Sequence, residues 1–76
     1  MKTLLEYIAK ALVDRPEAVE VVEHVREHGT VLELVVDKED VGKVVGRQGR
    51  TARAMRSVLA AASLKARHRT SLEIRE

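Results

Sequence analysis

Apolar and polar positions recur along the chain with two different periods. Near the N-terminus, four apolar residues follow the three- and four-residue spacing of an amphipathic helix: Leu5, Ile8, Ala9 and Leu12. Thr3 and Glu6 have the spacing of a capping box, which predicts that this helix begins at about Thr3. Arg15 ends it, because a residue before proline is driven out of the helical region. A first helix is therefore predicted over about residues 3–14.

Two valine-rich segments follow with the period of two that is typical of strands. The first runs from about Val19 to Arg26, and Gly29 marks the turn after it. In the second, one predicted face carries Leu32, Leu34 and Val36. The opposite face carries Val31, Glu33 and Val35. Because this run is apolar on nearly every position, it indicates a central strand rather than an edge strand.

A pair of helices is predicted next, separated by a glycine-bounded loop. Asp37 is placed to cap a short helix over about residues 38–45, with Glu39 and Asp40 favourable in its first turn. Gly46 ends that helix, and a longer one is expected over about residues 50–63. Its predicted core face consists of Ala52, Met55, Leu59 and Ala62. The residues that point the opposite way are Arg50, Arg53 and Ser57.

A last strand places Thr70, Leu72 and Ile74 on one face, against Arg69, Ser71, Glu73 and Arg75 on the other. The predicted order is α-β-β-α-α-β. Strands joined by a helical connection lie parallel, so the second and third strands should pair in parallel. The fold class is therefore α+β, with a three-stranded mixed sheet and helices on one face. A chain of 76 residues has room for one domain over 1–76.

Composition narrows the range of functions. The chain has no cysteine, which favours a reducing compartment and excludes disulfides and thiolate metal sites. No apolar run is long enough for a signal peptide or a membrane span, so we expect a cytoplasmic protein with no membrane partner. Residues 1–42 hold five Lys/Arg against ten Asp/Glu, whereas residues 43–76 hold nine against two. The basic half is a candidate surface for a polyanion, or else a basic helix packed beside an acidic one.

The loop Gly46-Arg47-Gln48-Gly49 carries the clearest candidate chemistry. Two glycines three residues apart allow a sharp turn and leave no Cβ in the way of a close ligand. The helix that restarts after the loop offers backbone amides and the positive end of its dipole to a phosphate. Gly-x-x-Gly alone also occurs at plain helix-turn-helix corners, so the pattern gains weight only from its context.

Basic residues recur every three or four positions around this loop, at Lys43, Arg47, Arg50 and Arg53. Next to a phosphate-ready helix start they favour nucleic-acid contact, although such stripes are also found as solvated charge. Arg67 and Arg69 flank the last strand and are further candidates.

No catalytic, metal or cofactor site is predicted. His24 and His28 are four residues apart, but in a strand and turn and without an obvious third ligand, and His68 is distant in sequence. No serine or threonine has a base and an orienting acid in a recognisable arrangement. Tyr7 is the only aromatic residue, so a base-stacking platform is excluded and any nucleic-acid reader must use backbone contacts and aliphatic packing.

The run from Asp40 to Arg56 resembles the KH domain, whose Gly-x-x-Gly loop holds about four nucleotides by their backbone. It is most similar to the small bacterial single-KH proteins of the KhpA family. Residues 12–17 and 72–74 also resemble that family, so the likeness covers essentially the whole chain. The resemblance implies a type II KH fold, with Val45 and Ala52 under the bases and the last strand as the second wall of a groove. Together with the basic stripe, this gives the RNA-binding set Lys43, Val45, Gly46, Arg47, Gln48, Gly49, Arg50 and Arg53.

The resemblance also implies single-stranded RNA as the ligand, an RNA-chaperone or post-transcriptional role, and links to cell-shape control in some bacteria. It further implies pairing, either with a second copy or with a larger KH-containing RNA-binding protein. On the long helix, Ala54, Val58 and Ala61 lie beside the core stripe and form a candidate homodimer seam, unless the core wraps widely around this helix. Two other functions stay open: a helix-turn-helix DNA binder and a pure protein-interaction module.

Overall fold

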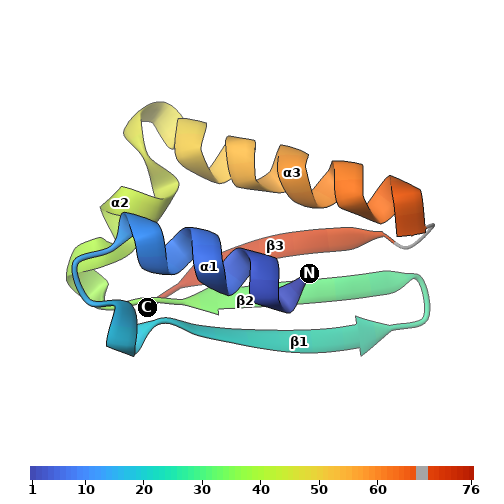
Figure 1. Ribbon diagram of the computed structural model, residues 1–76, viewed down its shortest axis with the longest axis horizontal. Helices are drawn as coiled ribbons and strands as arrows, with labels where there is room; N and C mark the ends of the chain where they lie inside the picture. The colour runs from blue at the N-terminus through green and yellow to red at the C-terminus, as the bar shows by residue number, and fades with distance from the viewer. Residues whose placement is uncertain (67–68) are drawn as a thin grey trace.

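The predicted α-β-β-α-α-β order is confirmed in the computed structural model, which describes residues 1–66 and 69–76 (Figure 1). The helices and strands are α1 (Lys2–Leu12), β1 (Glu20–Arg26), β2 (Gly29–Val35), α2 (Val41–Val45), α3 (Arg50–Ala66) and β3 (Thr70–Arg75). Single 3₁₀ turns connect them at η1 (Pro16–Ala18), η2 (Lys38–Asp40) and η3 (Arg47–Gly49).

The three strands form one mixed sheet in the order β1-β2-β3. β1 and β2 pair antiparallel, with Val21 opposite Leu34, and β2 and β3 pair parallel, with Leu32 opposite Leu72. The central position of the apolar strand and the parallel pairing of the last two strands are both confirmed. A parallel pair needs a long crossover, and α2 and α3 provide it.

Among the described residues, the helices pack against one face of this sheet only. The alternation in β2 buries Thr30, Leu32 and Leu34, with Val36 just beyond the strand, whereas the opposite face is only half-buried at Val31, Glu33 and Val35. The core between sheet and helices consists of Leu5, Ala9, Val21, Leu32, Leu34, Val36, Val44, Met55, Leu59 and Leu72. In Figure 1, α1 and α3 lie on the same side of the sheet, and α2 lies at one end.

The capping box predicted at the start of α1 is wrong. The helix begins at Lys2 with Met1 as its N-cap, no side chain caps it, and the Leu5 amide donates to the Met1 carbonyl at 3.0 Å. Met1 is partly buried against the core, so the chain is already helical before Thr3. Glu6 lies 4.0 Å from Lys10 in an ion pair instead of reaching back.

α1 also ends earlier than predicted, at Leu12 rather than at Asp14. Val13 is extended, with φ −97° and ψ 160°, and packs against the core. Leu12, predicted as a core residue, is 38% exposed. The chain leaves the helix here because Val13 turns inward and the next two amides bond to a carboxylate from another part of the fold.

α3 keeps its predicted core face except at its C-terminal end. Ala52, Met55 and Leu59 are buried and Arg50, Arg53 and Ser57 are exposed, as expected. Ala62 is only half-buried, and Ser63 is buried in its place. The Ser63 hydroxyl donates to the Leu59 carbonyl at 2.7 Å, so this polar side chain is satisfied inside the helix. α3 continues to Ala66, three residues past its predicted end at about residue 63.

Candidate nucleic-acid interface

The Gly46–Gly49 segment forms a tight left-handed connection between α2 and α3. The Gly46 amide donates to the Gly42 carbonyl at 2.9 Å, which closes α2, and the Gly49 amide donates to the Gly46 carbonyl at 3.1 Å. Gly46, Gln48 and Gly49 all have positive φ, at 78°, 56° and 73°. Among the described residues Gln48 is the only non-glycine with positive φ, a conformation that costs about 1–2 kcal/mol and is concentrated at functional sites.

The two glycines of this loop meet different needs. A Cβ on Gly46 would lie 2.2 Å from Thr51 Oγ1 and 2.8 Å from the Thr51 amide nitrogen, so the start of α3 packs directly on this residue. A Cβ on Gly49 would meet nothing within 4 Å. Gly46 is therefore required by both packing and φ, whereas Gly49 is required by φ alone and leaves one side of the loop open.

Two cations lie at this loop, and neither has a carboxylate partner in the part of the chain that the structure describes. Arg47 and Arg50 are exposed, and Arg50 Nη2 is 3.5 Å from Gln48 Oε1. Within residues 1–66 and 69–76, no hydrogen bond or ion pair holds the Arg47 guanidinium. The η3 turn that carries Arg47 leads into α3, and within it the Gly49 and Arg50 amides donate to the Gly46 and Arg47 carbonyls. The two arginines therefore lie at the N-terminal, positive end of the α3 dipole.

Arg53 has a different geometry from its neighbours. Its Nε is 3.4 Å from the Gly49 carbonyl oxygen, and its Nη2 donates to the Gln48 carbonyl oxygen. The guanidinium therefore bridges two loop carbonyls from the second turn of α3. This arrangement fits a side chain that fixes the loop rather than one that is free to reach a phosphate.

Val45 and Ala52, the aliphatic residues expected under the bases, expose little apolar surface. Val44 is fully buried in the core, Val45 is half-buried, and Ala52 is 4% exposed. Ala52 therefore offers almost no accessible surface, and Val45 carries the apolar contact that this end of the fold can offer.

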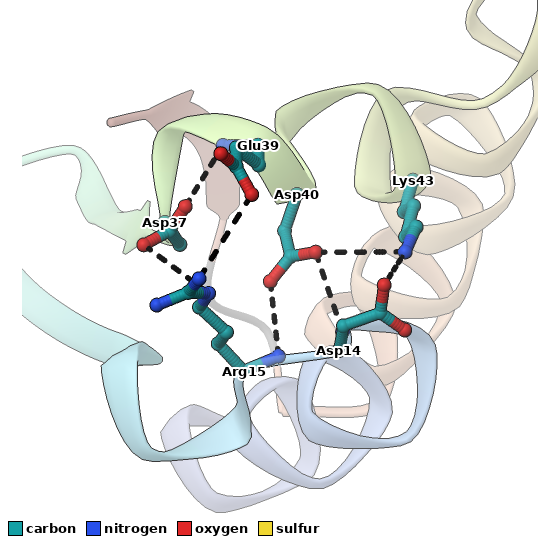
Figure 2. Close-up of polar contacts among 6 residues, drawn as sticks. All are labelled: Asp14, Arg15, Asp37, Glu39, Asp40 and Lys43. Atoms are coloured by element: carbon teal, nitrogen blue, oxygen red, sulfur yellow. Dashed lines mark hydrogen bonds and ion pairs between the residues drawn. The ribbon is translucent and has the colours of Figure 1, made fainter.

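Lys43, predicted with the RNA-binding set, is held by carboxylates (Figure 2). Its ammonium donates a hydrogen bond to Asp14 Oδ2 and lies 3.7 Å from Asp40 Oδ1. The hydrogen bond to Asp14 raises the pKa of Lys43 above its ordinary value of 10.5; desolvation opposes this, and the charges of Asp14 and Asp40 add to it. Lys43 thus differs from Arg47, because its charge is already compensated within the protein.

Asp40 has a structural role that the sequence did not reveal. It was expected only to favour the helix start, but it is 2% exposed. Its Oδ1 accepts from the Asp14 amide at 3.3 Å, and its Oδ2 accepts from the Arg15 amide at 3.1 Å. One buried carboxylate therefore joins the end of α1 to the start of α2. The only available signal was the three-residue spacing from Asp40 to Lys43, which does not distinguish a buried pair from a surface pair.

A second, exposed part of this cluster surrounds Arg15 (Figure 2). Arg15 Nε is 3.9 Å from Asp37 Oδ2, and its Nη2 is 4.0 Å from Glu39 Oε2. Asp37 caps η2 as predicted, since its side chain accepts from the Glu39 amide at 2.9 Å. Together these contacts fasten the segment before β1 to the segment before α2.

The remaining predicted candidates lie elsewhere. Arg69 directly precedes β3, at the end of α3 that is far from the loop; a 17-residue helix is about 25 Å long. Arg67 and His68 lie outside the described residues. His24 is in β1 and His28 in the turn after it, and the described residues contain no group of three or more His, Cys, Asp or Glu that could hold a metal ion.

The residues of the dimer seam predicted on α3 are exposed to solvent in the structure. Ala54 and Ala61 are exposed, and Val58 is 45% exposed, so the core does not wrap this far around the helix. Leu64, one turn after Ala61, is 81% exposed.

Comparison with known proteins decides the family. The family model described as the KH domain of KhpA and KhpB matches residues 2–74. The chain belongs to the KhpA/KhpB KH-domain family. Among KhpA relatives, the RNA-binding protein KhpA of Halalkalibacterium halodurans is 54% identical over 74 residues, covering 97% of each chain. The RNA-binding protein KhpA of Clostridium perfringens is 51% identical and covers 97% of this chain and 99% of its own.

A more distant relative, the RNA-binding protein KhpA of Chlamydia pneumoniae, is 46% identical over 76 residues, covering 100% of this chain and 97% of its own. No solved structure matches the chain significantly. The type II KH fold expected from the KhpA-like segments agrees with the observed three-stranded mixed sheet. Among the described residues, no helix has both the length and the apolar character needed to cross a bilayer.

Proposed function

We propose that this chain binds single-stranded RNA and that the Gly46–Gly49 loop holds the strand by its phosphates. One observation carries the proposal: a glycine-bounded loop with positive φ is open beside Gly49 and is flanked by two cations, Arg47 and Arg50, that no carboxylate of residues 1–66 or 69–76 neutralises. The KhpA relatives described above are named RNA-binding proteins, which supports the same ligand class.

The geometry favours backbone recognition over base reading. A phosphate next to Gly49 meets no Cβ, so it can approach the loop backbone closely, and the dipole of α3 favours negative charge there. Val45 supplies a small apolar contact, and Tyr7, the only aromatic residue, is on α1. We therefore expect modest, salt-sensitive affinity with little base preference, since phosphate contacts release counterions.

Replacing Arg47 and Gln48 together with aspartate tests this function. Aspartate tolerates the left-handed conformation of position 48, so the variant should fold normally while binding to a short oligoribonucleotide falls by at least about tenfold, the effect of removing two contacts and adding repulsion. Lys2→Asp with Thr3→Asp is the matched control, because it changes the charge equally at exposed positions of α1. Equal binding by the two double variants would contradict the proposal.

The two alternative functions give different results in the same titration. A helix-turn-helix DNA binder would prefer duplex DNA, but the exposed positions of α3 include Ala54, Ala60 and Ala61, which cannot read base edges by hydrogen bonds. A pure interaction module would bind neither nucleic acid. Tighter binding to single-stranded RNA than to duplex DNA is the result that we expect. The RNA-chaperone or post-transcriptional role and the cytoplasmic location stay predictions.

We also propose a homodimer through the α3 seam formed by Ala54, Val58 and Ala61. Small residues allow two helices to approach closely, and the exposed apolar surface favours burial. Val58→Glu should convert a sedimenting dimer into a monomer, whereas Ala60→Glu, about 160° away around the same helix, should not. A monomeric parent protein would leave the larger KH-containing partner as the remaining way to cover this seam.

A further inference from the structure

A small cavity of about 180 Å³ lies at the end of the sheet that is farthest from the Gly46–Gly49 loop. In Figure 1 this is the end where the β1–β2 hairpin turns, opposite the end that carries α2. Its lining includes Arg26, His28, Gly29, Val31, Arg69 and Ser71. The alternation along the strands places Arg26, Val31 and Ser71 on the sheet face that no helix covers.

Two arginines in this cavity flank a glycine across the strands. Arg26 is paired with Gly29 in the β1–β2 register, and the next residue, Thr30, donates its amide to the Arg69 carbonyl at 2.8 Å. Gly29 has φ 150°, and a Cβ there would lie 2.4 Å from the Arg69 carbonyl oxygen. A side chain at position 29 would collide with the Arg69 backbone, so glycine is required here and no side chain of residue 29 stands between Arg26 and Arg69.

The spacing suits one anion between two guanidinium groups. Neighbouring strands lie about 4.8 Å apart, so arginines separated by one strand have Cα atoms about 10 Å apart. Arginine side chains of that separation can converge on a single tetrahedral anion, and their planar forks match phosphate oxygens. Ser71 and His28 add a hydroxyl and an imidazole to the same lining.

The charged residues that line the cavity are positive. No carboxylate lines it, and neither Arg26 nor Arg69 forms an ion pair with any residue of 1–66 or 69–76. Elsewhere in the same ranges Lys10, Arg15, Lys43 and Arg75 each have a carboxylate partner within 4.0 Å. The cavity therefore combines two arginines that have no ion pair within the described residues with a lining that holds no carboxylate.

We propose that this cavity binds a phosphate group between Arg26 and Arg69. The inference goes beyond the proposed function, because nothing in the cavity depends on the loop. The phosphate can belong to the backbone of an RNA strand longer than the loop alone holds, or to a free phosphate compound. These two sources share the chemistry and differ in length dependence.

Amide chemical shifts of the full-length protein separate the possibilities. The probes are inorganic phosphate, a uridine tetranucleotide and a uridine dodecanucleotide, each at constant ionic strength set with chloride. Gly29 and Ser71 report on the cavity, and Gly46 and Gly49 report on the loop. We expect phosphate and the dodecanucleotide to shift the cavity amides, and the tetranucleotide to shift mainly the loop amides.

A double variant, Arg26→Ala with Arg69→Ala, should abolish the cavity shifts and leave the tetranucleotide shifts of the loop intact. It should also weaken dodecanucleotide binding by about two- to thirtyfold, the range spanned by two exposed charge pairs. Lys2→Ala with Lys38→Ala is the matched control, since both lysines are exposed and lie outside the cavity lining.

Each outcome has one meaning. Cavity shifts with phosphate but not with the dodecanucleotide assign a free phosphate compound, and cavity shifts with the dodecanucleotide assign RNA. Cavity amides that respond to neither probe, or that respond equally in the arginine variant and the parent, overturn the site. Loop shifts without cavity shifts overturn this inference alone, whereas cavity shifts without loop shifts overturn the proposed role of the loop.

Discussion

The two ends of α2 differ in how the nearby cations are held. At its start, Asp40 accepts from two amides of the α1–η1 connection, and together with Asp14 it pairs with Lys43 in the middle of the helix, so that charge is neutralised within the protein. Just past its end, Arg47 is exposed and has no carboxylate partner among residues 1–66 and 69–76. Only five residues form this helix, yet its start joins two segments of the fold and its end leads into an open cationic surface.

This difference distinguishes residues that stabilise the fold from residues that are available to a ligand. A buried carboxylate that accepts from backbone amides is costly to remove, whereas an exposed and unpaired charge contributes little to stability and is available to a polyanion. A stripe of basic residues in the sequence is therefore not one functional unit. Lys43 and Arg53 are engaged by the protein itself, whereas Arg47 and Arg50 have no carboxylate partner among residues 1–66 and 69–76 and are the cations that the proposed function uses.

The largest expected effect on stability is at Asp40, which joins the start of α2 to the end of α1. Asp40→Ala removes the acceptor of two backbone amides, those of Asp14 and Arg15, and each amide left without a partner costs about 1–3 kcal/mol. We expect a loss of about 2–5 kcal/mol in the free energy of unfolding, measured by urea denaturation, which would leave so small a domain near its stability limit.

Glu39→Ala is the control for Asp40, because it removes an exposed carboxylate of the same cluster that contacts only Arg15. Its effect should stay within about 0.5 kcal/mol. Similar denaturation midpoints for the two variants would show that the buried carboxylate does not hold the two segments together.

The next prediction compares Gly46 and Gly49, the two glycines of the loop that follows α2. Gly46→Ala places a Cβ against Thr51 and forces a left-handed alanine, for an expected loss of about 2–4 kcal/mol. Gly49→Ala incurs only the conformational cost, about 1 kcal/mol, because its Cβ meets open space. Urea denaturation of both variants measures the difference. Adding Thr51→Ala should recover only part of the Gly46 loss, since the Thr51 amide nitrogen remains 2.8 Å from the new Cβ.

The smallest effect concerns Lys43 and Arg47 as ligands of RNA. In a plot of log affinity against log salt, Arg47→Ala should reduce the slope by about 0.7, the value for one phosphate contact on a single strand. Lys43→Ala should leave the slope nearly unchanged, because its ammonium is already paired with Asp14. Fluorescence anisotropy with a labelled oligoribonucleotide at several salt concentrations measures both. A slope that falls equally in the two variants would remove the distinction between the ends of α2.

Local pattern was sufficient for most of the fold. The alternation of β2 fixed its central place, the helical periodicity of α3 identified Met55 and Leu59 as core, and the crossover length required β2 and β3 to be parallel. The loop could also be predicted, because two glycines three residues apart indicate a sharp turn, and both Gly46 and Gly49 have positive φ. These features depend on neighbours within a few positions of the chain.

Tertiary structure alone decided which charges are available. Asp14 and Asp40 are 26 residues apart, and nothing in their local sequence shows that the fold brings a buried carboxylate against the amides of that turn. The same holds for Arg26 and Arg69, which become neighbours of Gly29 only when three strands align. Periodicity predicts which face a side chain occupies, but the partner of a charge is set by contacts between segments that are distant in the chain.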